Sequence, residues 1–195
     1  MSAPPSPLTH SQRLRAATHA IHEALDQSLM AAQPFLSRDR YLRFLRMQYR
    51  FHHDIDPLFS HPGLANVVPD LAGRRRLERI IEDFADLGRA PPTPGAHPMP
   101  SFADLPTALG WFYVAEGSNL GAAILSRQAA ELGLDDTCGA RHLAGHPDGR
   151  ARHWRSFTSA LDALPLGPAE EDRLADGARA AFVRVQQYAQ QAFAD

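Results

Sequence analysis

One histidine among the ten in this chain stands out for its place on a helical pattern. His22 lies where the apolar and polar faces of a 3.6-residue period meet. Asp26 follows one turn later and can accept the second ring N–H, while Arg15 precedes His22 by two turns, about 10 Å along the axis. This arrangement suits an axial metal ligand whose cofactor keeps one edge in water, with an arginine for an acidic group on that cofactor. This helix alone leaves open a boundary histidine that is bonded only to a neighbour.

Other arrangements that could carry chemistry have weaker support. Cys138, His142 and His146 have the spacing C-x3-H-x3-H, but the glycines and the proline among them disfavour a helix, and no fourth zinc ligand is evident. The sequence holds no E-x-x-H pair of a di-iron bundle, no G-x-S-x-G motif and no phosphate-binding glycine loop. His52 and His53 are adjacent, so they point in different directions on a helix, and we expect both at the surface.

A second feature is the segment Gly110 to Gly121, G-W-F-Y-V-A-E-G-S-N-L-G, which carries three glycines inside a long helical pattern. Each interior glycine destabilises a helix by roughly 1 kcal/mol relative to alanine, so a compensating reason is needed. Gly110, Gly117 and Gly121 share one stripe, where the backbone is bare. The stripe favours either a tightly crossing helix or a flat ligand or gas molecule against the backbone. Glu116 is expected to be a buried acid or the partner of an arginine.

These residues lie in a sequence without convincing period-two alternation. Arg74 to Arg76 are expected on a solvated helix face, His61-Pro62-Gly63 is expected to end a helix, and residues 133–149 are expected to lack regular structure. We predict an all-α fold, with residues 9–195 forming a single multihelical domain of six or so helices behind a disordered lead-in of residues 1–8. Periodicity and caps predict helices from Ser11 onward, over 38–59 after the N-cap Ser37, and over 69–87, 103–132, 151–164 and 168–193.

Composition restricts the class of protein further. The 195 residues are 44 % apolar with a net charge of −2, which suits one globular domain and argues against an obligate nucleic-acid binder. All 20 basic residues are arginines, so recognition of carboxylates would use the forked guanidinium group. The single cysteine, Cys138, fits a reducing cytoplasm, and no apolar run approaches the roughly 18 residues of a membrane span. We expect a soluble, cytoplasmic protein that binds neither nucleic acid nor membranes.

Two segments together resemble a known family. Leu14 to His22, L-R-A-A-T-H-A-I-H, resembles the L-x-x-A-T-x-x-x-H motif of the haem oxygenases. Tyr113 to Gly121, Y-V-A-E-G-S-N-L-G, is similar to the distal-helix signature of the bacterial, biliverdin-forming branch of that family. Trp154-Arg155 and Ala181-Phe182 are similar to its C-terminal region, so the resemblance covers nearly the whole chain. It implies a haem sandwiched between the first helix and the glycine-bearing helix.

The resemblance also implies roles for single residues. His22 would be the axial iron ligand, and Asp26 stands where family members often hold a carboxylate bonded to that imidazole. Gly117 and Gly121 match the distal glycines whose backbone lies over the porphyrin. Ser118 stands where mammalian relatives have an aspartate that anchors the distal water network, so proton delivery here would use other water ligands. The further positions implied to contact haem are Thr18 and Ile21 at the haem face, Arg15 and Arg155 near the propionates, Tyr113 at the propionates or the pocket edge, and Phe182.

The implied activity is the oxidative opening of haem b to biliverdin, with O2 consumed and carbon monoxide and ferrous iron released. The sequence has no flavin or dinucleotide motif, so an external electron donor such as a ferredoxin or a flavoprotein reductase is implied. Iron acquisition and supply of biliverdin to a bacteriophytochrome both fit this activity. A carrier or sensor that holds haem without degrading it is the first alternative. An all-α interaction domain, whose glycine stripe only packs helices, is the second.

Overall fold

The computed structural model describes residues 8–94, 102 and 104–194, and every regular element in these residues is helical. The all-α prediction is confirmed. Of the predicted lead-in only Leu8 is described, and residues 95–100 of the proline-rich stretch also lie outside the described ranges. The α-helices described are α1 (His10–Ala32), α2 (Arg38–Ile55), α3 (Pro62–Val67), α4 (Leu77–Asp86), α5 (Leu105–Glu131), α6 (Arg150–Asp162) and α7 (Pro168–Phe193), with 3-10 helices η1 (Asp56–Ser60), η2 (Ala72–Arg74) and η3 (Arg141–Leu143).

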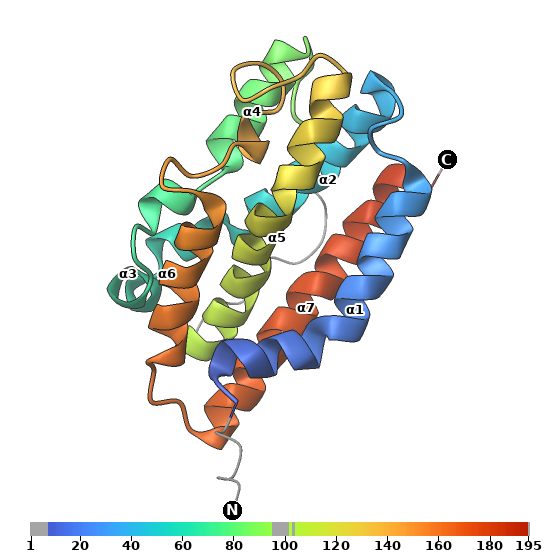
Figure 1. The fold of residues 1–195 in the computed structure, drawn as a ribbon. Helices are drawn as coiled ribbons and strands as arrows, with labels where there is room; N and C mark the ends of the chain where they lie inside the picture. Colours follow the sequence, from blue (N-terminus) through green and yellow to red (C-terminus); the bar gives the residue numbers. More distant parts are fainter. Residues whose placement is uncertain (1–7, 95–101, 103, 195) are drawn as a thin grey trace, which may run out of the picture.

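Helix α7 organises the packing. It packs along α1 and α5 and also contacts α2, and Figure 1 shows it between the ribbons of α1 and α5. Apolar residues spaced at three and four positions turn inward from each helix, as an amphipathic helix requires. The main core includes the fully buried Tyr41, Ile55, Leu58, Leu109, Phe112, Phe157, Leu161, Ala178 and Ala181.

Polar contacts fix the first turn of α1. The Thr9 hydroxyl accepts from the backbone N–H of Gln12, and the Gln12 side chain accepts from the N–H of Thr9, which forms a capping box. The backbone N–H and the hydroxyl of Ser11 donate to the two oxygens of Asp162 in α6 at 2.7 and 2.8 Å. The start of α1, which carries His22 three turns later, is therefore tied to the end of α6.

Two glycines allow α5 and α7 to cross at backbone contact. A Cβ on Gly110 would lie 2.2 Å from the carbonyl oxygen of Leu174 and 2.6 Å from the backbone nitrogen of Ala178. A Cβ on Gly177 would lie 2.5 Å from the carbonyl oxygen of Thr107. Of the two readings of the glycine stripe, the tightly crossing helix therefore applies at Gly110.

Two helix boundaries differ from prediction in the segment after α2. The helix predicted over 38–59 ends at Ile55, because Pro57 lacks an N–H and lies in the first turn of η1. His61-Pro62-Gly63 was expected only to end a helix, but Pro62 begins α3. The His61 side chain accepts from the N–H of Leu64 at 3.2 Å and so caps this short helix.

The helix predicted over 69–87 begins only at Leu77. Asp70 has a left-handed backbone, with φ 53°, and this conformation cannot continue a right-handed helix. The predicted solvated face is also wrong for Arg74 and Arg76, which are 1 % and 3 % exposed, although Arg75 is exposed. The interruption lets the chain turn Arg74 inward, toward a buried carboxylate on α5 that is described below.

Candidate functional site

Helix α1 presents a buried face and a solvent face, as predicted. Leu14 and Thr18 are buried, and the Thr18 hydroxyl donates to the carbonyl of Leu14 at 2.7 Å. Ile21 is half-buried and Arg15 is exposed. The side chain of His22 is 57 % exposed, so its imidazole borders the interior and reaches solvent.

The imidazole of His22 has neighbours on two helices. Its ring centroid lies 5.4 Å from that of Phe182, a buried residue of α7. The Nε2 atom lies 3.5 Å from Oδ2 of Asp26, one turn along α1. A carboxylate at this place favours a proton on the ring nitrogen that faces it and leaves the other nitrogen with a lone pair. The arrangement can therefore present one ring nitrogen to a metal while the other faces Asp26.

The second half of the glycine stripe is open, unlike Gly110. A Cβ on Gly117 would meet only the Trp154 ring, at 3.9 Å, and a Cβ on Gly121 would meet nothing within 4 Å. Leu120 and Ile124, on the same part of α5, are 40 % and 62 % exposed. Bare backbone flanked by exposed apolar side chains suits an apolar, flat ligand better than water.

Ser118 is exposed beside these glycines, and its hydroxyl donates to the carbonyl of Ala115 at 2.7 Å. The hydroxyl proton is thus directed into the backbone of its own helix, and the oxygen keeps lone pairs that can accept from water.

Two exposed arginines and a buried tyrosine lie on the surrounding helices. Neither Arg15 nor Arg155 forms an ion pair with a carboxylate of the described residues, so both guanidinium groups can bind an acidic ligand. Tyr113 is 8 % exposed and its ring lies 5.4 Å from that of Trp154. Burial raises the pKa of Tyr113 and the charge of Arg15 opposes this, which places α1 and α5 within electrostatic reach of each other.

A buried ion pair lies directly behind the open glycines. Glu116 is 3 % exposed and pairs with Arg74, which also donates to the carbonyl of Pro69 at 2.8 Å and the hydroxyl of Ser156 at 2.8 Å. Burial raises the pKa of Glu116 and the Arg74 guanidinium opposes this rise. The expectation that Glu116 is a buried acid or pairs with an arginine is confirmed on both counts. Sequence reasoning missed the partner, because Arg74 looked like part of an exposed basic run.

The structure does not bring together the three residues of the C-x3-H-x3-H spacing. Cys138 is exposed, whereas Nδ1 of the buried His142 lies 2.6 Å from Oδ2 of Asp83. These residues and His146 do not form a metal-binding group among the described residues. The surface expectation is wrong for His52, which is 4 % exposed because α2 turns it inward. Burial lowers the pKa of His52 to about 3, so it is neutral at physiological pH.

Comparisons with known proteins agree with this arrangement. A family model described as heme oxygenase matches residues 8–191. The chain is 42 % identical over 184 residues to "Heme oxygenase PigA" of Pseudomonas aeruginosa, covering 94 % of this chain and 93 % of that protein. The NO- and CO-bound heme oxygenase of Neisseria meningitidis matches with a TM-score of 0.89 and 39 % identity, over 96 % of this chain and 94 % of that one. Heme oxygenase from Leptospira interrogans shares the fold, with a TM-score of 0.74 and 19 % identity over 94 % of this chain and 100 % of that one.

The all-helical architecture is that of a haem-degrading oxygenase. The chain belongs to the haem oxygenase family. Membership implies haem as substrate, O2 as co-substrate and a reductase as the source of electrons. A carrier that holds haem without degrading it is not favoured. Within the described residues, no helix combines the length and the hydropathy needed to span a bilayer.

Proposed function

We propose that this enzyme binds haem b between α1 and the open glycine segment of α5, with His22 as the axial iron ligand. The observation that carries the proposal is the contrast along α5: Gly110 is closed by α7, whereas Gly121 has nothing within 4 Å of a Cβ position. Bare backbone flanked by the exposed Leu120 and Ile124 is costly to keep in water, so this segment favours a flat apolar partner. Haem in this position supplies the iron that activates dioxygen, and the ring that is opened.

The proximal residues hold and orient the ring. His22 would hold the iron through one ring nitrogen, and Asp26 would accept the proton of the other ring nitrogen and fix the tautomer. Phe182 packs against the imidazole and limits its rotation. Thr18 and Ile21 contribute the surface of α1 that meets the haem face. The guanidinium groups of Arg15 and Arg155 bind the propionates, and Tyr113 borders the same edge of the pocket.

The distal residues act mainly by leaving space. Gly117 and Gly121 place no side chain over the ring, so no distal acid or base directs cleavage away from the porphyrin edge. Because the Ser118 hydroxyl donates to Ala115, it accepts hydrogen bonds from water at this site and does not deliver a proton of its own. Protons therefore reach the distal pocket through ordered water. The products are biliverdin, carbon monoxide and ferrous iron.

The partners follow from this chemistry. The electron donor is a separate redox protein, a ferredoxin or a flavoprotein reductase. A bacteriophytochrome is proposed as an acceptor of the biliverdin. The exposed free thiol of Cys138 supports a reducing, cytoplasmic location.

The test combines haem titration with a turnover assay on the parent and on His22→Ala. The parent is expected to shift the Soret band on binding and, with reductant in air, to lose this band and form biliverdin, identified by chromatography. His22→Ala is expected to bind haem with an altered ferric spectrum and no turnover, and added imidazole should restore part of the activity. His53→Ala serves as the control, since His53 lies on α2 outside the proposed pocket. A ferric spectrum of His22→Ala identical to that of the parent would show that His22 is not the axial ligand.

A further inference from the structure

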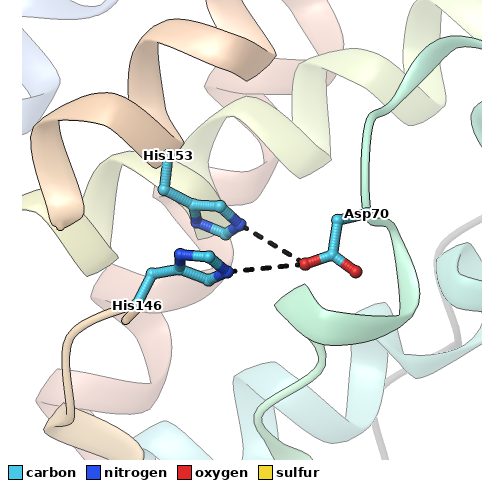
Figure 2. Close-up of side chains that lie close together, drawn as sticks. All are labelled: Asp70, His146 and His153. Carbon is cyan, nitrogen blue, oxygen red and sulfur yellow. Dashed lines mark ion pairs between the residues drawn. The ribbon is translucent and has the colours of Figure 1, made fainter. Parts of the chain in front are cut away.

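Three side chains of types that can bind a metal converge from separate segments beside α5. Figure 2 shows the imidazoles of His146, in the loop before α6, and His153, in α6, both directed at the carboxylate of Asp70, in the loop before η2. Their Nε2 atoms lie 3.6 and 4.0 Å from Oδ2 of Asp70. One potential ligand atom of each residue lies within 4.8 Å of the others. None of the three residues is among those proposed to bind haem.

The cluster contains a buried polar atom without a partner. His153 is 8 % exposed, and its Nε2 makes no hydrogen bond although it is buried and faces the cluster. Buried nitrogen atoms are normally satisfied, and an unsatisfied one often indicates a missing water or ion. Burial and the charge of Arg74 lower the pKa of His153, because both disfavour the protonated ring. His146 stacks on it, with 4.1 Å between ring centroids and 7° between planes.

The donor set has a defined chemical preference. Two imidazoles and one carboxylate suit zinc and the neighbouring divalent metals, with open positions left for water. Metal–ligand bonds of about 2.0–2.1 Å would hold tetrahedral ligand atoms about 3.3 Å apart. Since the three ligand atoms now lie within 4.8 Å of one another, each distance between them must shorten by less than about 1.5 Å. Asp70 and His146 can supply this movement, since their side chains are 55 % and 21 % exposed in loops. The two parallel rings must also splay to direct both lone pairs at one ion.

A metal ion can bind Nε2 of each histidine only when the ring proton is on Nδ1. The N–H of Asp148 donates to Nδ1 of His146 at 3.1 Å, so this bond must be given up when Nδ1 carries the proton and Nε2 binds a metal. Nδ1 of His153 lies 3.8 Å from Oε2 of Glu116, a carboxylate able to accept its proton and orient the ring. Nη1 of Arg74 donates to this nitrogen at 3.4 Å, so this bond too must be given up when Nδ1 carries the proton, and the charge of Arg74 weakens cation binding.

We propose that Asp70, His146 and His153 form a binding site for a divalent first-row transition-metal ion, separate from the haem iron. The ion satisfies Nε2 of His153 and joins the loop before η2 to α6. Through His153 the site also adjoins Glu116, the residue before Gly117. The site does not depend on the haem ligands proposed above.

The experiment uses the full chain without haem, after chelator treatment, with Co²⁺ as the spectroscopic probe and Zn²⁺ for calorimetry. The parent is expected to bind one ion, with the intense visible absorption of low-coordinate Co²⁺ and a raised melting temperature. Asp70→Asn keeps a residue that tolerates φ 53° and removes the charge, and His146→Ala removes a partly exposed ligand. Each should weaken binding at least tenfold, because even the loss of a residue that only orients a ligand costs about 10–100-fold in metal affinity.

His53→Ala and His22→Ala are the matched controls, and both should retain the parent affinity. Circular dichroism and melting of each metal-free variant check that the fold is kept. Failure of the parent to bind Co²⁺ or Zn²⁺ would overturn the proposal, as would unchanged binding in both Asp70→Asn and His146→Ala. Loss of binding in His22→Ala alone would place the ion at α1 and also overturn it. Loss of haem turnover with metal binding intact would concern only the proposed function.

Discussion

Two glycine-to-alanine substitutions on α5, at Gly110 and Gly121, should have opposite effects on stability. In both cases alanine is the better helix former, by about 1 kcal/mol. At Gly110 the new Cβ would lie 2.2 Å from the carbonyl oxygen of Leu174, where ordinary contact begins at 3.4 Å. The helices α5 and α7 would have to part by about 1 Å along their crossing, in an interior that is close-packed. At Gly121 the Cβ meets no atom within 4 Å.

The expected magnitudes follow from these contacts. Overpacking costs about 1–3 kcal/mol, and two backbones in contact put Gly110→Ala at the upper end of that range. After the gain in helix propensity, the free energy of unfolding should fall by about 2 kcal/mol, which lowers the melting temperature by about 4–8 °C for a chain of this size. Gly121→Ala should raise the free energy of unfolding of the haem-free protein by about 0.5–1 kcal/mol. In the same variant the added methyl group enters the proposed haem space, and kcat/KM should fall about tenfold, equal to about 1.4 kcal/mol.

Urea unfolding of the haem-free proteins, haem titration and biliverdin formation measure these effects. A Gly110→Ala variant as stable as the parent would refute the backbone contact between α5 and α7. A Gly121→Ala variant with the haem affinity and turnover of the parent would refute the assignment of the open glycine segment of α5 to the distal side of the haem. The two substitutions control for each other, since both replace an interior glycine of one helix.

Three further predictions concern buried groups. Glu116→Leu should lower the free energy of unfolding by about 3–5 kcal/mol, because Arg74 stays buried without its carboxylate partner. Adding Arg74→Met should recover most of this loss. A Glu116→Leu protein within about 1 kcal/mol of the parent in urea unfolding would contradict this prediction. His52 has a pKa of about 3 in the folded protein and of about 6.5 in the unfolded chain. The free energy of unfolding should therefore be highest above pH 6.5 and decline by up to about 1.4 kcal/mol per pH unit as the pH falls toward 3. In pH-dependent urea unfolding His52→Leu should flatten this decline, and an unchanged slope would exclude His52 as its source. Phe182→Leu should change the free energy of unfolding by less than about 1.5 kcal/mol. It should weaken haem binding, because the His22 imidazole loses the ring that limits its rotation. A haem affinity equal to that of the parent in a titration would argue against this positioning role of Phe182.

Much of the local structure could be predicted from the sequence. Helix α7 begins at Pro168 and ends at Phe193, as predicted, because proline favours a first helical position and the apolar spacing is regular. Ser37 caps α2, and its hydroxyl accepts from the N–H of Arg40. These features depend on residues within one or two turns of each other. The segment 69–76 was predicted incorrectly because Asp70 adopts a left-handed backbone, which its residue type tolerates but does not require.

The sequence by itself determined the family, through the motif that ends at His22 and the segment that ends at Gly121, and it determined which residues share a helix face. It could not decide what lies opposite each face. Only the tertiary structure showed that Gly110 meets α7 while Gly121 is open, and that Arg74 pairs with Glu116. The grouping of Asp70 with two histidines is likewise a tertiary fact. Helical periodicity reports the direction of a side chain, whereas its partner comes from a distant segment that is positioned only when the helices pack.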